Sequence, residues 1–124
     1  FYQCFKLKLV TIFSSITVIR KDLFYDCYKL SQIIIPSSVT TIEEGAFNEC
    51  SSLTQIIIPY RVISIGKKAF YDCSSLTKVE ISPSVTFIGE SAFQYCSSLE
   101  EVEIPFATFL NENAFEPVTK IIRI

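Results

Sequence analysis

Histidine is absent from this 124-residue chain, and its absence narrows the chemistry that the protein could perform. Without histidine there is no usual general base, no Ser-His or Cys-His catalytic pair and no imidazole metal ligand. The sequence also has no G-x-S-x-G motif, no phosphate-binding loop and no dinucleotide-binding glycine fingerprint. We therefore expect no enzyme activity, no cofactor, and no catalytic or metal-binding residues.

The chain also lacks long apolar runs and a strong net charge. Hydrophobic residues make up 49% of the sequence, but no run approaches the ~18 residues that a membrane-spanning helix needs. The formal net charge is -2, and the few basic residues are not interleaved with aromatic residues that could stack on bases. We expect neither membrane insertion nor nucleic-acid binding, and the length suits one domain over residues 1–124.

Two further absences concern the N-terminus. The sequence begins "FYQCFKLKLV", without an initiating Met and without a signal peptide's order of basic region, apolar region and cleavage site. These features suggest a chain that was trimmed or cut from a longer one. The lack of a targeting signal therefore says little about the cellular compartment.

A strict internal repeat is the strongest signal in the sequence. The stretch "AFNECSSLTQIIIP" returns 23 residues later as "AFYDCSSLTKVEIS" and again as "AFQYCSSLEEVEIP". Five columns keep this period, and the clearest two are the cysteines and the leucines: Cys4, Cys27, Cys50, Cys73 and Cys96, with Leu7, Leu30, Leu53, Leu76 and Leu99. The repeats run approximately over 7–29, 30–52, 53–75, 76–98 and 99–120, after a partial repeat at 1–6.

Each repeat contains the pattern of two short strands and a turn. In "LTQIIIP", Ile56 and Ile58 alternate with outward residues, as expected for a strand, and a proline then ends the ladder. A second inward pair follows, such as Val62 and Ile65, and Gly66 is expected to permit a turn. The "AF" pairs predict a short helical turn that drives phenylalanine into the core. Because one coil cannot bury all these residues, the coils must stack.

The pattern "IPSSVTTIEEGAFNECSSL" resembles the leucine-rich repeats of the BspA-like (Treponema-type) class. The resemblance covers nearly the whole chain and weakens after Pro105. It implies a leucine-rich-repeat solenoid, a right-handed coil of about five 23-residue repeats made mostly of short β-strands with short helical turns. It also implies a recognition surface, often in adhesive cell-surface proteins. Glu43 departs from the pattern where glycine is usual, the segment 106–115 is one residue short, and no cysteine follows Phe115.

The cysteine column predicts a ladder of free thiols. Equivalent side chains in neighbouring coils point in parallel about 4.8 Å apart, whereas a relaxed disulfide brings its Cβ atoms to about 3.8 Å. A straight column also cannot supply tetrahedral zinc ligands. We therefore expect five reduced cysteines that act as small buried hydrophobes. Unpaired cysteines are compatible with a cytoplasmic location, whereas the family resemblance suggests the cell surface.

The outward strand positions are the candidate interaction face, because the inward positions are occupied by packing. Gln32 and Gln55 could stack, Lys78 could pair with Glu101, and Ile34 and Ile57 place aliphatic groups in solvent. The alternative is that isolated surface aliphatics are ordinary strand residues. The complete candidate set is Leu9, Gln32, Ile34, Gln55, Ile57, Tyr60, Lys78, Glu80, Glu101 and Glu103.

The carboxylates of Glu80 and Glu103 share one outward column, a spacing close to that of the two carboxyl groups in retaining glycosidases. An open strand face lacks the pocket that would shift their pKa values, so a solvated acidic surface is the favoured interpretation.

Two functions therefore remain open. The first is a non-catalytic module for protein–protein interaction, including adhesive recognition, whose partner is a protein or cell-surface ligand. The second is a structural repeat unit whose main partner is another copy. Open solenoid ends, with a formal charge of +3 over residues 1–42 and -5 over the remainder, favour a homo-oligomer. At the C-terminal end, either Val118 or Ile121 could fill the leucine column.

Overall fold

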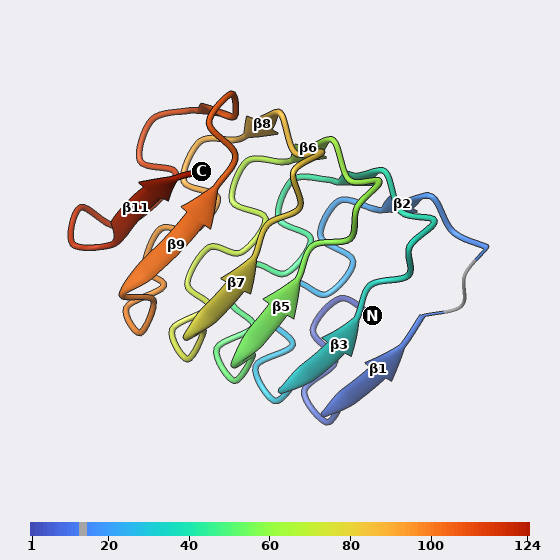
Figure 1. Ribbon diagram of the computed structural model, residues 1–124. Helices are drawn as coiled ribbons and strands as arrows, with labels where there is room; N and C mark the ends of the chain where they lie inside the picture. The colour runs from blue at the N-terminus through green and yellow to red at the C-terminus, as the bar shows by residue number, and fades with distance from the viewer. Residues whose placement is uncertain (13–14) are drawn as a thin grey trace.

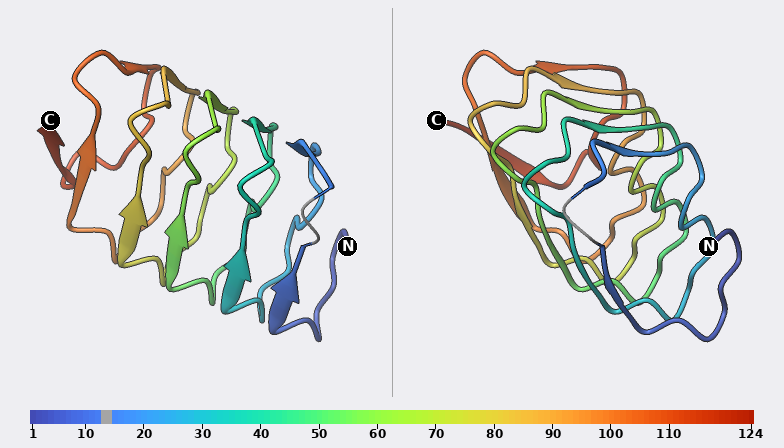
Figure 2. Two further views of the ribbon diagram at one scale, coloured as in Figure 1. Left: turned by 45° about the vertical axis from the view of Figure 1, so that its right-hand side comes forward. Right: turned by 90° about the vertical axis from the view of Figure 1, so that its right-hand side faces the viewer.

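The computed structural model describes residues 1–12 and 15–124, which form a β-solenoid with its termini at opposite ends of the stack (Figures 1 and 2). The first predicted repeat, 7–29, includes residues 13 and 14, which lie outside the described residues. One side of the solenoid, here called the first face, carries the strands β1 (Leu9–Thr11), β3 (Gln32–Ile34), β5 (Gln55–Ile57), β7 (Lys78–Glu80), β9 (Glu101–Ile104) and β11 (Lys120–Arg123).

The second face carries the shorter strand of each coil. These strands are β2 (Val18–Ile19), β4 (Thr41–Ile42), β6 (Ser64–Ile65), β8 (Phe87–Ile88) and β10 (Phe109–Leu110). They form one continuous parallel sheet in the order β10-β8-β6-β4-β2. The prolines that follow the strands of the first face lie at the corner between the two faces, because proline has no N–H for a further ladder bond.

Strand pairing on the first face differs from that on the second. The strands pair two by two, β1 with β3, β5 with β7, and β9 with β11, all in parallel. In each three-residue strand the central residue is buried and the two flanking residues are exposed, as the predicted alternation requires. The neighbouring strands β3 and β5 are therefore not paired with each other, and neither are β7 and β9.

A stack of phenylalanine rings runs through the core from one end of the solenoid to the other. Neighbouring rings lie nearly parallel, with centroids 4.9 to 5.5 Å apart and interplanar angles of 1 to 10°. Its members are Phe1, Phe24, Phe47, Phe70, Phe93 and Phe115. Phe24 through Phe93 are fully buried, so the predicted inward position of this column is confirmed.

The predicted helical turns are wrong: over residues 1–12 and 15–124 every regular element is a β-strand. In the coil around Phe24, Asp22 and Asp26 have positive φ angles of 53°, and such left-handed residues interrupt any helix. The equivalent pairs in the next three coils are also left-handed, whereas the last coil has one such residue, Asn113. Alternate N–H groups then reach the next coil, as when Phe24 N donates to Ala46 O at 2.8 Å. Hydrogen bonds between coils therefore replace those within a helix.

The glycines have roles that the repeat pattern did not predict. Gly45 is the glycine with a positive φ, at 66°. At Gly66 and Gly89 the backbone of the preceding coil comes so close that no side chain fits. A Cβ atom at Gly89 would lie 2.6 Å from Lys67 N, and one at Gly66 would lie 2.7 Å from Glu44 N. These two glycines therefore allow close stacking of the coils.

The last coil resolves the register that the sequence left open. Ile121 pairs with Val102 and is 40% exposed, whereas Val118 is 84% exposed. Neither fills the leucine column. Thr119 is instead buried, and its hydroxyl donates a 2.9 Å hydrogen bond to Leu99 O. The guanidinium of Arg123 turns back to donate to the carbonyls of Pro105 and Phe106 at 3.3 and 3.2 Å.

Candidate interaction surface

All ten residues of the candidate set are exposed, and the fold brings nine of them together on the first face. The nine residues belong to strands β1, β3, β5, β7 and β9, which lie side by side along the solenoid in Figure 1. Tyr60 is the exception, because it follows Pro59 at the corner beyond the end of β5. Its ring lies there beneath the guanidinium of Arg61, 5.8 Å from the ring centroid. Tyr60 therefore borders the face rather than lying on it.

An apolar hollow of about 330 Å³ lies over the junction between β3 and β5. Ile34 and Ile57, which are 68% and 60% exposed, form its rim, and Ile33 and Ile35 contribute to its lining although they are almost buried. Since β3 pairs with β1 and β5 with β7, the hollow follows a break in strand pairing. Its remaining lining residues are Leu9, Gln32, Gln55 and Pro59.

A second, charged hollow of about 640 Å³ lies over the next break in pairing, between β7 and β9. Lys78 and Glu80 line it from β7, and Glu101 and Glu103 line it from β9. Ile124 is also among its lining residues. The first face is thus divided along the solenoid axis into an aliphatic half and an acidic half.

The sequence suggested that Lys78 pairs with Glu101 of the next coil. In the structure it pairs with Glu80 of its own strand instead. The Lys78 Nζ atom lies 2.8 Å from Glu80 Oε1. Residues two apart in a strand point to the same face, so this pair forms without any contact between coils. The hydrogen bond with Glu80, and then the charge of that carboxylate, raise the pKa of Lys78.

The cysteines lie away from this surface, in the interior of the solenoid. All five are free thiols, and Cys27, Cys50, Cys73 and Cys96 are buried. Each buried thiol approaches the carbonyl oxygen of the stacked phenylalanine one coil earlier, as Cys50 Sγ does to Phe24 O at 3.1 Å. Burial raises the pKa of Cys96 to about 12 and that of Cys73 well above its usual value. Such thiols are poor nucleophiles.

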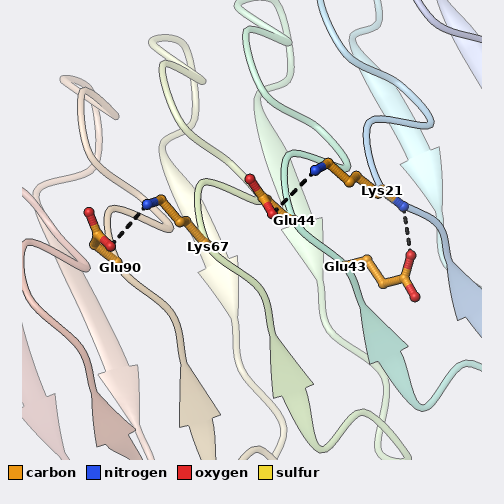
Figure 3. A network of polar contacts seen from close by, with 5 residues as sticks. All are labelled: Lys21, Glu43, Glu44, Lys67 and Glu90. Carbon is orange, nitrogen blue, oxygen red and sulfur yellow. Dashed lines mark hydrogen bonds and ion pairs between the residues drawn. The ribbon is translucent and has the colours of Figure 1, made fainter.

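A column of alternating charge joins neighbouring coils and was missed in the sequence. Lys21, Glu44, Lys67 and Glu90 are successive members of one 23-residue column, and they form two ion pairs in Figure 3. Lys21 Nζ lies 3.5 Å from Glu44 Oε2, and Lys67 Nζ lies 3.1 Å from Glu90 Oε2. The backbone N–H of Lys21 also donates to Glu43 at 2.8 Å. The alternation of sign at the repeat period could have revealed this column.

An aromatic patch on the second face was also missed. Phe87 and Phe109 stack with a centroid distance of 5.9 Å and an interplanar angle of 8°. Phe109 is 62% exposed, and Ile63, which directly precedes β6, is 54% exposed. Both phenylalanines occupy outward positions of adjacent strands, β8 and β10. The sequence signal was weak, because the equivalent positions in earlier coils are Val18, Thr41 and Ser64.

Neither a metal-ligand cluster nor a membrane-spanning helix occurs in the described parts of the chain. Residues 1–12 and 15–124 contain no group of three or more Cys, Asp or Glu side chains placed to hold a metal ion. In the same residues, no helix has the length and apolar character needed to cross a bilayer.

Comparison with known families agrees with the repeat geometry. The profile described as "BspA type Leucine rich repeat region" matches residues 1–122 in six copies. The chain belongs to the BspA-type leucine-rich-repeat family. No curated protein matches it significantly.

Solved structures show the same fold as this BspA-type chain. A leucine-rich repeat protein from Bacteroides ovatus superposes with a TM-score of 0.91 at 37% identity, covering 100% of this chain and 32% of that protein. The T. pallidum leucine-rich repeat protein TpLRR gives 0.82 at 30% identity, covering 98% and 63%. The pneumococcal vaccine antigen PcpA gives 0.75 at 30% identity, covering 92% and 29%. The chain therefore spans less than two thirds of each of these proteins.

Proposed function

We propose that this BspA-type chain is a non-catalytic module for protein–protein interaction, and that its partner binds the first face. The observation that carries the proposal is the apolar hollow between β3 and β5, where Ile34 and Ile57 project into solvent on either side of an isoleucine floor. Exposed aliphatic surface of this kind is costly to leave in water and is typical of a binding site. Residues 1–124 act as one domain in this proposal.

Adhesive recognition at a cell surface is the specific form of this function that we propose. The stacked repeats create an extended, rigid surface, and repeat proteins use such surfaces to bind partners. The family assignment supports the proposal. One of the three similar solved structures is a vaccine antigen, the pneumococcal protein PcpA. The binding residues would be the candidate set on β1 to β9, with Tyr60 at its border.

A matched pair of double variants tests the site. Ile34→Glu with Ile57→Glu charges the apolar hollow, whereas Ile63→Glu with Phe109→Glu makes the same change at two exposed apolar residues of the second face. Both variants should keep the wild-type circular dichroism and melting temperature. Capture of a cell-surface protein from native extract by wild type and by the second variant, but not by the first, is the expected result. Capture that is lost only in the second variant would place the site on the aromatic patch.

A second candidate function, self-association through the solenoid ends, is favoured by the exposure of core-type residues at the N-terminal end. Phe1 and Phe5 are 62% and 43% exposed, and Cys4 and Leu7, which belong to buried columns elsewhere, are only partly buried. Stacking of another copy would cover them, and the opposite charges of the two ends favour a head-to-tail homo-oligomer. Light scattering coupled to size exclusion should then show a mass that rises with protein concentration. A constant 14.1 kDa species would contradict this candidate.

A further inference from the structure

One row of outward side chains on the first face changes from aliphatic to acidic along the solenoid axis, from Ile34 and Ile57 to Glu80 and Glu103. Strand pairing places Ile34 opposite Thr11, Glu80 opposite Ile57, and Ile122 opposite Glu103. Ile57 and Glu103 are two strands apart in this row. Paired strands such as β5 and β7 lie about 4.8 Å apart, and the unpaired β7 and β9 are no closer, so the two residues are separated by about 10 Å or more across the face.

Glu103 is the carboxylate of this face that the protein itself leaves least balanced. The ammonium of Lys78 binds Glu80 at 2.8 Å, and Lys120 lies directly opposite Glu101 in the β9-β11 pair. Glu103 lies between Glu80 and Ile122 instead. Within residues 1–12 and 15–124 no ion pair joins Glu103 to a basic side chain. An exposed anion therefore lies two strands from the rim of the apolar hollow.

We propose that the first face recognises a basic amphipathic segment of another protein: a large aliphatic or aromatic side chain enters the hollow between β3 and β5, and a lysine or arginine reaches Glu103. This inference rests on the proposed function and adds the chemical class of the partner. The required separation of about 10 Å corresponds to residues seven apart on an α-helix, at about 1.5 Å per residue. It also corresponds to residues three apart in polyproline II, at about 3.1 Å per residue.

The charge pattern argues against a parallel face-to-face dimer as the occupant of this face. A face-to-face dimer with aligned solenoid axes would place hollow on hollow, but it would also place Glu103 on Glu103. Like charges that are brought together in an interface oppose binding. A basic segment satisfies both halves of the face at once, because its apolar group is buried and its charge is complementary.

A display experiment on the full chain tests the partner chemistry. Random twelve-residue peptides displayed on phage are selected against the wild-type protein, and the enriched peptides are synthesised. Their dissociation constants are measured for wild type, Glu103→Lys, Ile34→Glu with Ile57→Glu, and the second-face control Ile63→Glu with Phe109→Glu. Circular dichroism and melting temperature confirm that each variant is folded.

The proposal expects enriched peptides that combine a large apolar residue with a lysine or arginine three or seven positions away. Glu103→Lys should weaken their binding about tenfold, the Ile34/Ile57 variant should abolish it, and the control should leave it unchanged. Added salt should weaken binding to wild type more than binding to Glu103→Lys.

Three other outcomes distinguish failure of the proposed basic partner from failure of the proposed binding face. Peptides that require Ile34 and Ile57 but bind Glu103→Lys equally well would overturn the basic partner and leave the proposed binding face intact. Peptides that ignore both changes, or no enrichment at all, would overturn both. A dimer in light scattering that only the Ile34/Ile57 variant loses would show that a second copy occupies the hollow, which also overturns the basic partner.

Discussion

The thiol column shows how one residue type serves each coil of this solenoid. A cysteine side chain is small enough for the space beside the phenylalanine stack, and its thiol contacts a carbonyl oxygen in the neighbouring coil at 3.0 to 3.2 Å. This weak polar contact costs little and leaves the thiol neutral. The same burial that excludes water also makes ionisation unfavourable, which gives the column a measurable pH dependence.

At the scale of single residues, the raised pKa of Cys96 predicts that the protein loses stability at alkaline pH. Its pKa rises to about 12 in the folded state, whereas an unfolded thiol titrates near about 8.5. The folded state therefore holds its proton while the unfolded state loses one, so the contribution to stability is complete below about pH 8.5 and falls as the pH rises toward the folded pKa. One such thiol should cost about 1.4 kcal/mol by pH 9.5.

Urea unfolding in the presence of reductant checks this value. Between pH 7.5 and pH 9.5, the difference in the free energy of unfolding between wild type and Cys96→Ala should shrink by about 1.4 kcal/mol. Leu99→Ala, which removes a buried side chain that does not titrate, serves as the comparison and should show no such change. A pH-independent difference for Cys96 would show that this thiol ionises as readily in the folded protein as in the unfolded one.

At the scale of elements, the turns between the two faces are as regular as the strands. Each coil between Asp22 and Tyr95 uses two left-handed residues, so that its N–H groups alternate between bonds within the coil and bonds to the next coil. The coils are thereby drawn together along this side of the solenoid. Close stacking has a steric consequence, because Gly66 and Gly89 lie against the backbone of the preceding coil.

Gly89→Ala is expected to destabilise the protein by about 1 to 3 kcal/mol, the usual cost of overpacking. The added Cβ would lie 2.6 Å from Lys67 N, and backbone at that position cannot move without separating the coils. Chemical denaturation measures the change. The control is Glu43→Ala at the equivalent position two coils earlier, which already carries a Cβ and should cost about 1 kcal/mol or less through its hydrogen bond to Lys21 N. Equal costs for both substitutions would contradict the steric explanation.

At the scale of the whole molecule, each coil contacts only its neighbours, so stability depends on position along the axis. Phe47 is fully buried between two stacked rings, at centroid distances of 5.2 and 5.0 Å. Phe1 belongs to the same column but stacks on Phe24 alone and is 62% exposed. The ring of Phe1 therefore has one stacked neighbour, whereas the ring of Phe47 has two.

The same substitution should thus have unequal effects at the two positions. Phe47→Leu creates a cavity in the middle of the stack and should lower the free energy of unfolding by about 1 to 2 kcal/mol. Phe1→Leu should change it by less than about 0.5 kcal/mol, as expected for an exposed residue. Urea unfolding of both variants provides the comparison. Similar losses would indicate that the N-terminal end is covered in solution, as self-association predicts.

The repeat itself was determined by the sequence. Residues that fill the core must recur whenever a coil returns to the same place, so a 23-residue column of Phe, Cys or Leu indicates an inward position without further information. The exposure of Ile34, Ile57 and the acidic residues follows from the same alternation. The turn conformation does not follow from the sequence, because left-handed Asp22 and Lys68 carry no signal as clear as glycine, and the "AF" pairs favour a helical turn by their sequence alone.

Only the tertiary structure decided how the outward residues are grouped. The break in pairing between β3 and β5 creates the apolar hollow, although the sequence repeats without interruption there. Lys78 binds Glu80 rather than Glu101, and Thr119 rather than Val118 or Ile121 is buried beside Leu99. The physical reason is that periodicity specifies which residues face inward, whereas the partner of each outward side chain depends on how successive coils stack and which of their strands pair.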